Sequence, residues 1–383
     1  MSERHCRDAR FVWNLAVEQF NWGARGRSAP GGAERMRQLA EARQEFNWLR
    51  CGASTVQQQA LRDFDWAVKG FFDGTHRRPT WRKRGRHEGF CLRDTKVRLH
   101  AHKWALVHVP KLGWVRFRLS RPLPPGALGM ARITRNTGGR WHVSFPGPQP
   151  GVPDAGRCGR AVGIDRGVAT TIATSDGQML RAPVMRQRER KRLVRLQQKW
   201  ARQRKRSARW QATKADIGRV HQRVADRRRD WVEKVTTKLA ANYELVAVEA
   251  LPVRTMVRRP KPKPDPDNSG QFLPNGAAAK AGLNRAIHAN CWGLIAKRLE
   301  QKMSSSGTTL VVVPAHYSSQ QCRKCGHISP ENRKSQAEFR CKSCGHADHA
   351  DANAAAVILA RATPAPTPGS GATPSGVLVK ART

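Results

Sequence analysis

Residues 161–180 read AVGIDRGVATTIATSDGQML, and this stretch decides the fold class that we expect. It contains two short apolar runs, which an Asp-Gly turn signal at 176–177 separates into strands of one sheet. Farther along the chain, LVAV (245–248) predicts a buried strand and TTLVVVPA (308–315) predicts another. Since helical patterns lie between these strands, the sequence predicts an α/β domain.

Carboxylates stand where three of these elements end or begin. Asp165 ends the strand VGI, Glu249 ends LVAV, and Asp351 opens the helix DANAAAVILA. An RNase H-like sheet brings such positions together, and several carboxylates can hold the two Mg²⁺ ions, about 4 Å apart, that assist phosphodiester hydrolysis. A charge buried at a sheet end is costly unless it is paired or metal-bound. The pattern therefore predicts that Asp165, Glu249 and Asp351 are catalytic residues and magnesium ligands.

Each of these residues also has a plainer interpretation. Asp165 could be a turn residue, Glu249 a surface charge and Asp351 an N-cap. Asp348 lies three residues before Asp351 and competes for the metal role. The helical pattern Asp-x-Asn-Ala-Ala begins at Asp351, so we favour Asp351.

A cysteine cluster precedes the last carboxylate. Two Cys-x-x-Cys knuckles are each followed by glycine, and four thiolates at this spacing can converge tetrahedrally on one Zn²⁺. Because protein fills every position, the site should be structural, and His346 and His349 should be loop residues. The other five cysteines are scattered singly, which argues against a disulfide framework. The predicted zinc ligands are Cys322, Cys325, Cys341 and Cys344.

The charge of the chain indicates a polyanionic partner. Among 383 residues, 71 Lys and Arg stand against 28 Asp and Glu, a net charge of +43, which would repel itself without a polyanion. A nucleic-acid partner is the natural interpretation; a ribosomal-type scaffold protein and a basic chain from a GC-rich genome are the alternatives.

The densest charge lies between Arg186 and Arg229, where 18 Lys and Arg accompany three acidic residues and a thin apolar stripe. We interpret this stretch as a long helical pair with one packed face. A solvated face normally mixes both signs, so the basic face should bind phosphates. The predicted contacts are Arg186, Arg188, Arg190, Lys191, Arg192, Arg195, Lys199, Arg202, Arg204, Lys205, Arg206, Arg209, Arg227, Arg228 and Arg229.

The N-terminal part predicts two further regions. Residues 5–72 show apolar residues at helical spacing in three segments, with a loop over 23–32. The period then changes to two, which predicts a small β-domain with strands at 96–100, 104–109, 114–119, 131–137 and 140–145. In WVRFRL (114–119), Val115, Phe117 and Leu119 share one face, and Arg116 and Arg118 share the other, which suits a phosphate-binding wall and a merely solvated face equally.

The remaining segments are a polar loop at 258–276, one helix from about Leu283 to Lys302, and a low-complexity tail at 362–383 that should be disordered. No stretch approaches the roughly 20 apolar residues of a membrane span, and Met1–Arg10 lacks a signal-peptide core. We therefore expect a cytoplasmic protein.

Several motifs together resemble the transposon-encoded TnpB family, which is related to compact type V CRISPR effectors. They occur in the family's order and approximate spacing: GIDRGVAT (163–170), RRRDWVEKVTTKLA (227–240), AVEALPVRTM (247–256), KAGLNRAI (280–287), SSQQCRKCGH (318–327) and HADANAAAVILA (349–360). The resemblance covers the chain from about Ala9 to Ala360. It implies that Asp165, Glu249 and Asp351 form a RuvC triad and that the four cysteines are the ribbon ligands.

The resemblance also implies a domain order. We expect a helical recognition lobe (1–75), a wedge-type β-barrel (76–155), a RuvC-like nuclease domain (156–317, with basic helices 186–240, and 348–361) and an inserted zinc ribbon (318–347) before the tail. Family members usually place a strand ahead of the helix that matches HCRDARFVWNLAVEQ (5–19), whereas Met1 lies almost at that helix. The first barrel strand is therefore expected either upstream of Met1 or not at all.

The implied activity is cleavage of double-stranded DNA next to a short transposon-associated motif, directed by a guide RNA from the element's end. Basic channels for a heteroduplex backbone suit such a protein. Three alternatives remain: a compact type V CRISPR effector of the same fold, a transposase that joins DNA strands, and a catalytically silent guided repressor, which the intact triad disfavours.

Overall fold

The computed structural model describes residues 2–23, 28–123, 126, 128–147, 151–156, 158–268 and 270–363. The chain divides into two compact units, one formed by Met1–Pro148 and Arg188–Gln222 and the other by Gln149–Gln187 and Arg223–Thr383. The domain boundaries expected from the sequence stay predictions. From residue 364 on, the tail expected to be disordered lies outside the described residues.

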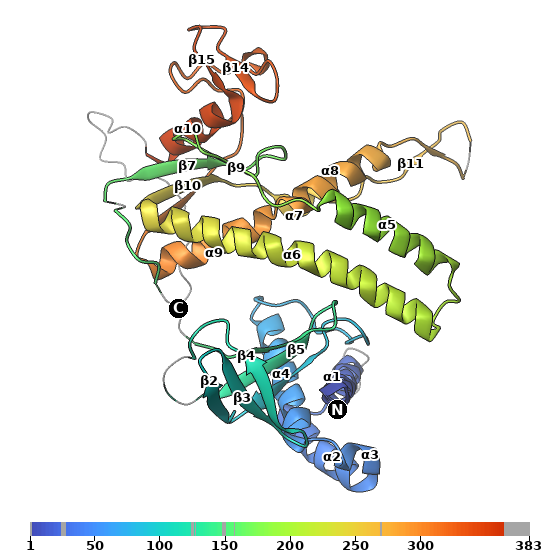
Figure 1. Cartoon of the computed structure of the whole chain (residues 1–383). Helices are drawn as coiled ribbons and strands as arrows, with labels where there is room; N and C mark the ends of the chain where they lie inside the picture. The colour runs from blue at the N-terminus through green and yellow to red at the C-terminus, as the bar shows by residue number, and fades with distance from the viewer. Residues whose placement is uncertain are drawn as a thin grey trace. The chain divides into compact units, whose positions relative to one another are not determined.

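The first unit begins with a helical lobe (Figure 1). Its helices α1, α2 and α4 confirm the three predicted helical segments, and the short α3 lies between the last two. Val12, Leu39 and Phe64 are buried where they pack together, and the Trp13 ring meets Phe64 edge-on at 5.4 Å. The bounds are α1 (Ser2–Gly23), α2 (Gly32–Glu45), α3 (Asn47–Arg50) and α4 (Ser54–Phe72).

The β-domain of the first unit consists of two three-stranded antiparallel sheets, ordered β1-β5-β6 and β2-β3-β4. Phe90 and Leu92 of β1 share one apolar core with the helical lobe and with Val107 and Val109 of β3. The sequence did not predict β1, and a closed wedge-type barrel stays a prediction. The bounds are β1 (Gly89–Arg93), β2 (Val97–Ala101), β3 (Trp104–Val109), β4 (Gly113–Arg118), β5 (Met130–Arg135) and β6 (Trp141–Ser144).

The second unit is built on a five-stranded sheet ordered β13-β10-β7-β8-β9. The three strands β7, β10 and β13 run parallel to one another. Strand β8 pairs antiparallel with β7, and β9 pairs antiparallel with β8. Because Val248 lies opposite Ile164 in the register, the next residues, Glu249 and Asp165, end their strands at the same edge. The bounds are β7 (Ala161–Asp165), β8 (Ile172–Thr174), β9 (Met179–Leu180), β10 (Leu245–Glu249) and β13 (Thr309–Val313).

Helices pack against this sheet. Leu239 of α6 (Ala208–Asn242) and Ile295 of α9 (Trp292–Ser305) share an apolar core with Ile164 and Val246 of the strands. Ile358 of α10 (Ala350–Ala362) packs against Ala247 and Val313. Here α10 approaches β7 backbone to backbone, since a Cβ on Gly163 would lie 2.0 Å from the carbonyl oxygen of Ala355.

The helix predicted from about Leu283 to Lys302 is wrong as one element. The chain forms α8 (Ala277–Ala289) and α9, with Asn290 and Cys291 between them. Cys291 has a φ of 58°, in the left-handed region that side chains rarely adopt, so the helical path turns there. The side-chain amide of Asn290 donates to the carbonyl of Val168 and accepts from the hydroxyl of Thr171.

Three smaller features complete the second unit: the turn α7 (Val253–Met256), a hairpin and the cysteine ribbon. The hairpin strands β11 (Lys263–Pro264) and β12 (Phe272–Leu273) pair only with each other among the described residues, and Figure 1 shows them at the end of an arm beyond α8. The ribbon contains the 3-10 turn Pro330–Asn332 and the antiparallel strands β14 (Glu338–Arg340) and β15 (Ala347–His349). Across the part of the chain that the structure describes, every helix is too short or too polar to cross a bilayer.

Candidate active site

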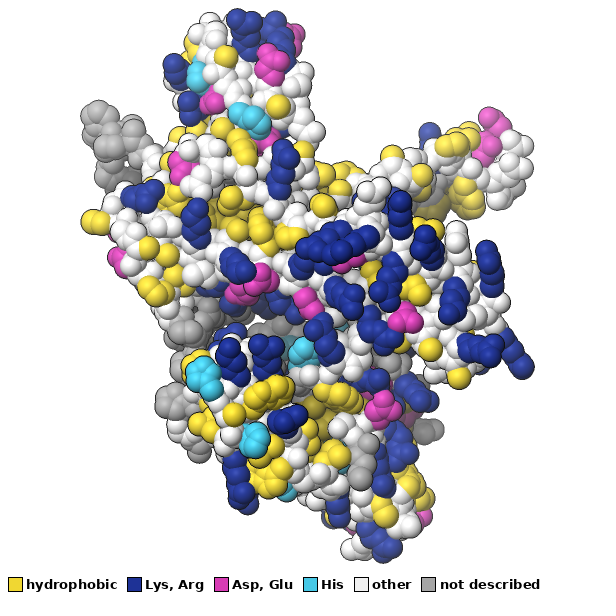
Figure 2. Space-filling view, in the orientation of Figure 1, with side chains coloured by type: hydrophobic (Ala, Val, Ile, Leu, Met, Phe, Trp, Pro, Cys, Tyr) yellow, Lys and Arg dark blue, Asp and Glu magenta, His cyan; other side chains and the backbone are white. Residues whose placement is uncertain are grey.

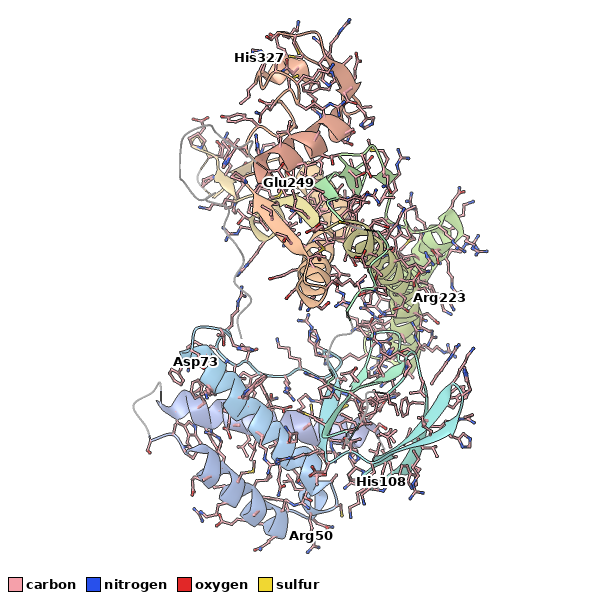
Figure 3. All side chains as sticks on the ribbon, turned by 90° about the vertical axis from the view of Figure 1, so that its left-hand side faces the viewer. Arg50, Asp73, His108, Arg223, Glu249 and His327 are labelled. Carbon is pink, nitrogen blue, oxygen red and sulfur yellow. The ribbon has the colours of Figure 1, made fainter. Side chains whose placement is uncertain are left out.

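Three carboxylates gather where β7, β10 and α10 meet. Asp165 is the last residue of β7, Glu249 is the last of β10, and Asp351 lies in the first turn of α10. Asp165 and Glu249 are joined by a side-chain hydrogen bond, and Glu249 and Asp351 are each only 6% exposed. Figure 3 labels Glu249 at the end of its strand, close to α10. The structure thus brings the three sequence-predicted residues together, and their catalytic role stays a prediction.

The site concentrates negative charge in a buried position. Burial, together with the charges of Glu249 and Asp351, raises the pKa of Asp165 from 3.8 to about 7. Burial also raises the pKa of Glu249, against the opposing charge of Arg166. Carboxylate oxygens are the ligands that Mg²⁺ prefers, so the chemistry of this donor set suits Mg²⁺.

This pKa shift gives a testable pH dependence. Between about pH 4 and pH 7 the native Asp165 holds a proton that the unfolded chain has lost, so its contribution to stability falls as pH rises. We expect the metal-free Asp165→Asn variant to gain stability over the wild type across this window, by at most about 4 kcal/mol at about 1.4 kcal/mol per pKa unit. Melting temperatures at pH 4.5 and 7.5 test this, and equal differences at both values would contradict it.

Two arginines at the site were missed by the sequence reasoning. Arg333 of the ribbon places Nη2 2.9 Å from Oδ1 of Asp351. Arg166 is buried and donates from Nη2 to the backbone carbonyl of Glu249. The position of Arg166 beside Asp165 was a signal that could have been used, whereas Arg333 is 18 residues from its partner and gave none.

The contacts of Asp351, Asp348 and His346 bear on the competing interpretations. The N-cap of α10 is His349, whose Nδ1 accepts from the backbone N–H of Asp351 at 3.2 Å, so Asp351 is not the cap. Asp348 lies in β15 and pairs with Arg323 of the ribbon at 3.2 Å. His346 stays in the ribbon, where the side chain of Arg323 donates to its ring at 3.1 Å.

The four ribbon cysteines converge as the spacing predicts. Their sulfur atoms all lie within 4.8 Å of one another. Each knuckle is closed alike: the N–H of Gly326 donates to the backbone carbonyl of Cys322, and that of Gly345 donates to the backbone carbonyl of Cys341. The two glycines have left-handed φ values of 76° and 69°. The cluster can therefore hold a metal ion in the closed four-thiolate arrangement that zinc prefers.

The ribbon is tied directly to the helix that carries Asp351. Asn353 of α10 is fully buried; it accepts from the backbone N–H of Arg323 at 3.0 Å and donates to the carbonyl of Gln321 at 2.7 Å. Because both partners adjoin Cys322, the position of the first knuckle and the start of α10 are coupled.

Most of the predicted phosphate contacts are exposed. Helix α5 (Gln187–Arg202) has no buried residue, and Trp200 and Trp210 stack at 4.9 Å where α5 and α6 lie side by side. Figure 2 shows Lys and Arg side chains gathered over these helices. Arg227 and Arg228 are half-buried. Arg228 donates from Nε to the carbonyl of Pro183 at 3.1 Å, so this donor is already used within the protein.

The strands β2, β3 and β4 present a second basic face. The register puts Trp104 opposite Arg118 and Arg116 opposite Leu106, so these side chains share one face. The Arg116 guanidinium lies 5.0 Å from the Trp104 ring, and that of Arg98 lies 4.3 Å from the Trp114 ring. The sequence predicted Arg116 and Arg118 of this face but missed Arg98 and the tryptophans; the period of two that relates Trp114 to Arg116 and Arg118 was the available signal.

Comparisons with known proteins agree with this architecture. Residues 151–259 match the OrfB_IS605 family, described as "Probable transposase", and residues 292–358 match the "Cas12f1-like, TNB domain" family. The chain is 33% identical to "Putative RNA-guided DNA endonuclease InsQ" of Escherichia coli (strain K12), over 92% of this chain and 86% of that protein. It is 29% identical to "Putative RNA-guided DNA endonuclease" of Streptomyces pristinaespiralis, over 86% and 77%.

The fold also has a solved counterpart. A Cas12f1–sgRNA–target DNA complex contains a chain that matches at a TM-score of 0.55 and 12% sequence identity, over 93% of this chain and 81% of the other. At this identity the match concerns the fold alone. The chain carries three carboxylates at one site and a four-cysteine ribbon, and 92% of its own length matches a relative that is 33% identical. The chain therefore belongs to the TnpB family of insertion-sequence proteins, which is related to compact type V CRISPR effectors.

Proposed function

We propose that the chain is an RNA-guided DNA endonuclease that hydrolyses double-stranded DNA next to a short target-adjacent motif. The observation that carries the proposal is the group formed at one sheet edge by half-buried Asp165 and buried Glu249 and Asp351. The names of its relatives in Escherichia coli and Streptomyces support the same activity. In this proposal the second unit is a RuvC-type, RNase H-like nuclease domain with an inserted zinc ribbon, and the β-domain acts as the wedge.

The three carboxylates would hold two Mg²⁺ ions. The chemistry that such ions supply when bound is activation of water and stabilisation of the leaving oxygen. The chain itself contributes the position of the ligands: two carboxylates are fixed by parallel strands, and the third is fixed by a helix whose backbone touches β7. Arg333 balances the charge of Asp351. The ribbon would hold one structural Zn²⁺ through its four cysteines.

The partners in this proposal are a guide RNA and a target duplex. Sequence is then read by base pairing, so the protein mainly needs positive surfaces that follow phosphates. The exposed arginines of α5 and the Arg–Trp face of β2–β4 supply such surfaces.

The proposal is tested by expressing the protein with its flanking genomic DNA and sequencing the RNA that copurifies. The purified particle is then given duplex DNA that matches or mismatches this RNA, with and without Mg²⁺. We expect a discrete RNA and cutting of the matched duplex only when Mg²⁺ is present. A particle without discrete RNA, or with RNA but without cutting, would contradict the proposal, and joined DNA strands would instead indicate a transposase.

The basic face of α5 gives a separate prediction about binding. Arg188, Arg192 and Arg195 are exposed at helical spacing on α5. Replacing all three with glutamine should weaken RNA binding and reduce the slope of log K against log salt by about 2, since each lost phosphate contact removes roughly 0.7–0.9. Filter binding at several salt concentrations measures the slope. The control is Arg37→Gln, because Arg37 already pairs with Glu34 and Glu41; equal slopes for both variants would refute the assignment.

A further inference from the structure

The corner between α8 and α9 contacts the loop that follows Asp165. The corner residues are Asn290 and Cys291, and Trp292 begins α9. The loop runs from Arg166 to Thr171, between the end of β7 and the start of β8. Thr171, Asn290 and Trp292 are 1%, 9% and 4% exposed, so their polar groups are almost withdrawn from water. Buried polar groups of this kind need specific partners.

Each partner lies in or beside the loop. Nε1 of Trp292 donates to the carbonyl of Gly167 at 3.2 Å, and Nδ2 of Asn290 donates to the carbonyl of Val168 at 3.0 Å. The hydroxyl of Thr171 donates to Oδ1 of Asn290, and its oxygen accepts from the N–H of Ala182 at 2.8 Å. We call Thr171, Asn290 and Trp292 the corner triad. Through Trp292 and Asn290, the loop carbonyls of Gly167 and Val168 are held by side chains from a distant part of the sequence.

Two further contacts restrain the backbone of this loop. Gly167 closes a tight turn, because its N–H donates to the carbonyl of Thr170 at 3.0 Å and a Cβ on Gly167 would lie 2.7 Å from that same oxygen. On the other side, Arg166 donates to the backbone carbonyl of Glu249. The backbone after Asp165 is therefore fixed toward β10 by Arg166 and toward the corner by Asn290 and Trp292.

A fixed backbone after Asp165 keeps this carboxylate close to Glu249 and Asp351. The charges of Glu249 and Asp351 repel that of Asp165, so a loose strand end would let Asp165 move away from its neighbours. A metal site also needs its ligands held to within about 0.5 Å of the productive geometry by the residues that support them. The left-handed conformation of Cys291 costs free energy that an unbroken helix would avoid. The hydrogen bonds of the corner triad offset this cost only if the corner keeps this shape.

We propose that Thr171, Asn290 and Trp292 are positioning residues that hold Asp165 in the geometry that binds the divalent cations. The inference rests on the proposed function, because it concerns the same carboxylate site. It assigns a role to three residues that touch neither the metal nor the substrate. Supporting residues of this kind typically change metal affinity by about 10–100-fold when removed.

The test measures cation binding separately from cutting. The full-length chain, freed of RNA, is titrated with Mn²⁺ as a spectroscopic substitute for Mg²⁺, and free Mn²⁺ is counted by its electron paramagnetic resonance signal. Subtracting the isotherm of Asp165→Ala isolates the Asp165-dependent sites. Thr171→Val removes one hydroxyl and keeps the side-chain shape, whereas Trp292→Phe removes the indole N–H and leaves a smaller ring. We expect each to raise the Mn²⁺ dissociation constant about tenfold and to speed hydrogen exchange at Gly167.

Two controls separate positioning from stability. Thr171→Ser keeps the hydroxyl and should restore wild-type affinity. Thr236→Val removes an equally buried hydroxyl, which donates to the carbonyl of Val232 within α6, and should lower stability without changing Mn²⁺ binding. Wild-type affinity in Thr171→Val and Trp292→Phe would overturn this inference and leave the nuclease proposal standing. If the wild type shows no Asp165-dependent Mn²⁺ sites, the metal site itself is wrong and both proposals fall.

Discussion

Replacing Asp165 with alanine is expected to abolish cutting while leaving the RNA-bound particle intact. The charges of Glu249 and Asp351 both act on Asp165, and its side chain is within hydrogen-bonding reach of Glu249. Removing a metal ligand should lower the cutting rate by more than about 100-fold, the upper end of what supporting residues cost. Since the change also relieves repulsion between buried charges, the melting temperature of the metal-free chain should not fall.

The measurement compares cutting rates of purified particles at saturating Mg²⁺, with the amount of copurified RNA as the check on assembly. Asp348→Ala is the matched control, because Asp348 lies only three residues before Asp351 and pairs with Arg323 of the ribbon. We expect this control to keep most of its activity. Near-normal cutting by Asp165→Ala would remove Asp165 from the catalytic group, and loss of activity in Asp348→Ala alone would move the third ligand to Asp348.

The second large effect is expected from the cysteine ribbon. Its apolar core consists of Cys322, Phe339, Cys341 and Ala350, of which two are proposed zinc ligands, so the ribbon has little else to hold it together. A structural zinc contributes about 10 kcal/mol or more to folding in such small modules. Cys341→Ser should therefore unfold the ribbon. Because Asn353 ties the first knuckle to α10, the position of Asp351 should be disturbed and cutting should be lost.

Zinc content, protease resistance and DNA cutting together test this prediction. Elemental analysis should find one zinc per wild-type chain and less in Cys341→Ser. Limited proteolysis should cut the variant within 318–349 while the five-stranded sheet stays resistant. Cys158→Ser, which removes an exposed cysteine outside the cluster, should match the wild type in all respects. A zinc-free variant whose ribbon resists protease and whose particle still cuts DNA would show that the metal is dispensable.

Short-range patterns explain what could be predicted from the sequence. The strands that end in Asp165 and Glu249 are continuous apolar runs, and the knuckles repeat a fixed spacing, so both could be located locally. In contrast, β1 consists of five residues that become a strand by pairing with β5, about 40 residues away. Its burial depends on a core shared with the helical lobe.

Other features depend on contacts that local patterns do not contain. Residues 283–302 contain no proline and show continuous helical spacing, so a single helix was predicted; the break at Asn290 depends on partners more than 100 residues earlier. Arg333 shows no pattern at all, because its role follows only from the fold of the ribbon over α10. The carboxylates of the candidate site were thus more predictable than the residues that hold or neutralise them.

The hairpin of β11 and β12 has a practical consequence for protein engineering. Its strands pair only with each other among the described residues, so its tip could receive a foreign domain at little expense to the sheet that carries Asp165 and Glu249. A light-sensitive or drug-binding module fused there would be carried by the chain far in sequence from α10, whose backbone lies directly against β7 at Gly163. The arm is therefore the place to attach controllers, reporters or effector enzymes to this compact scaffold.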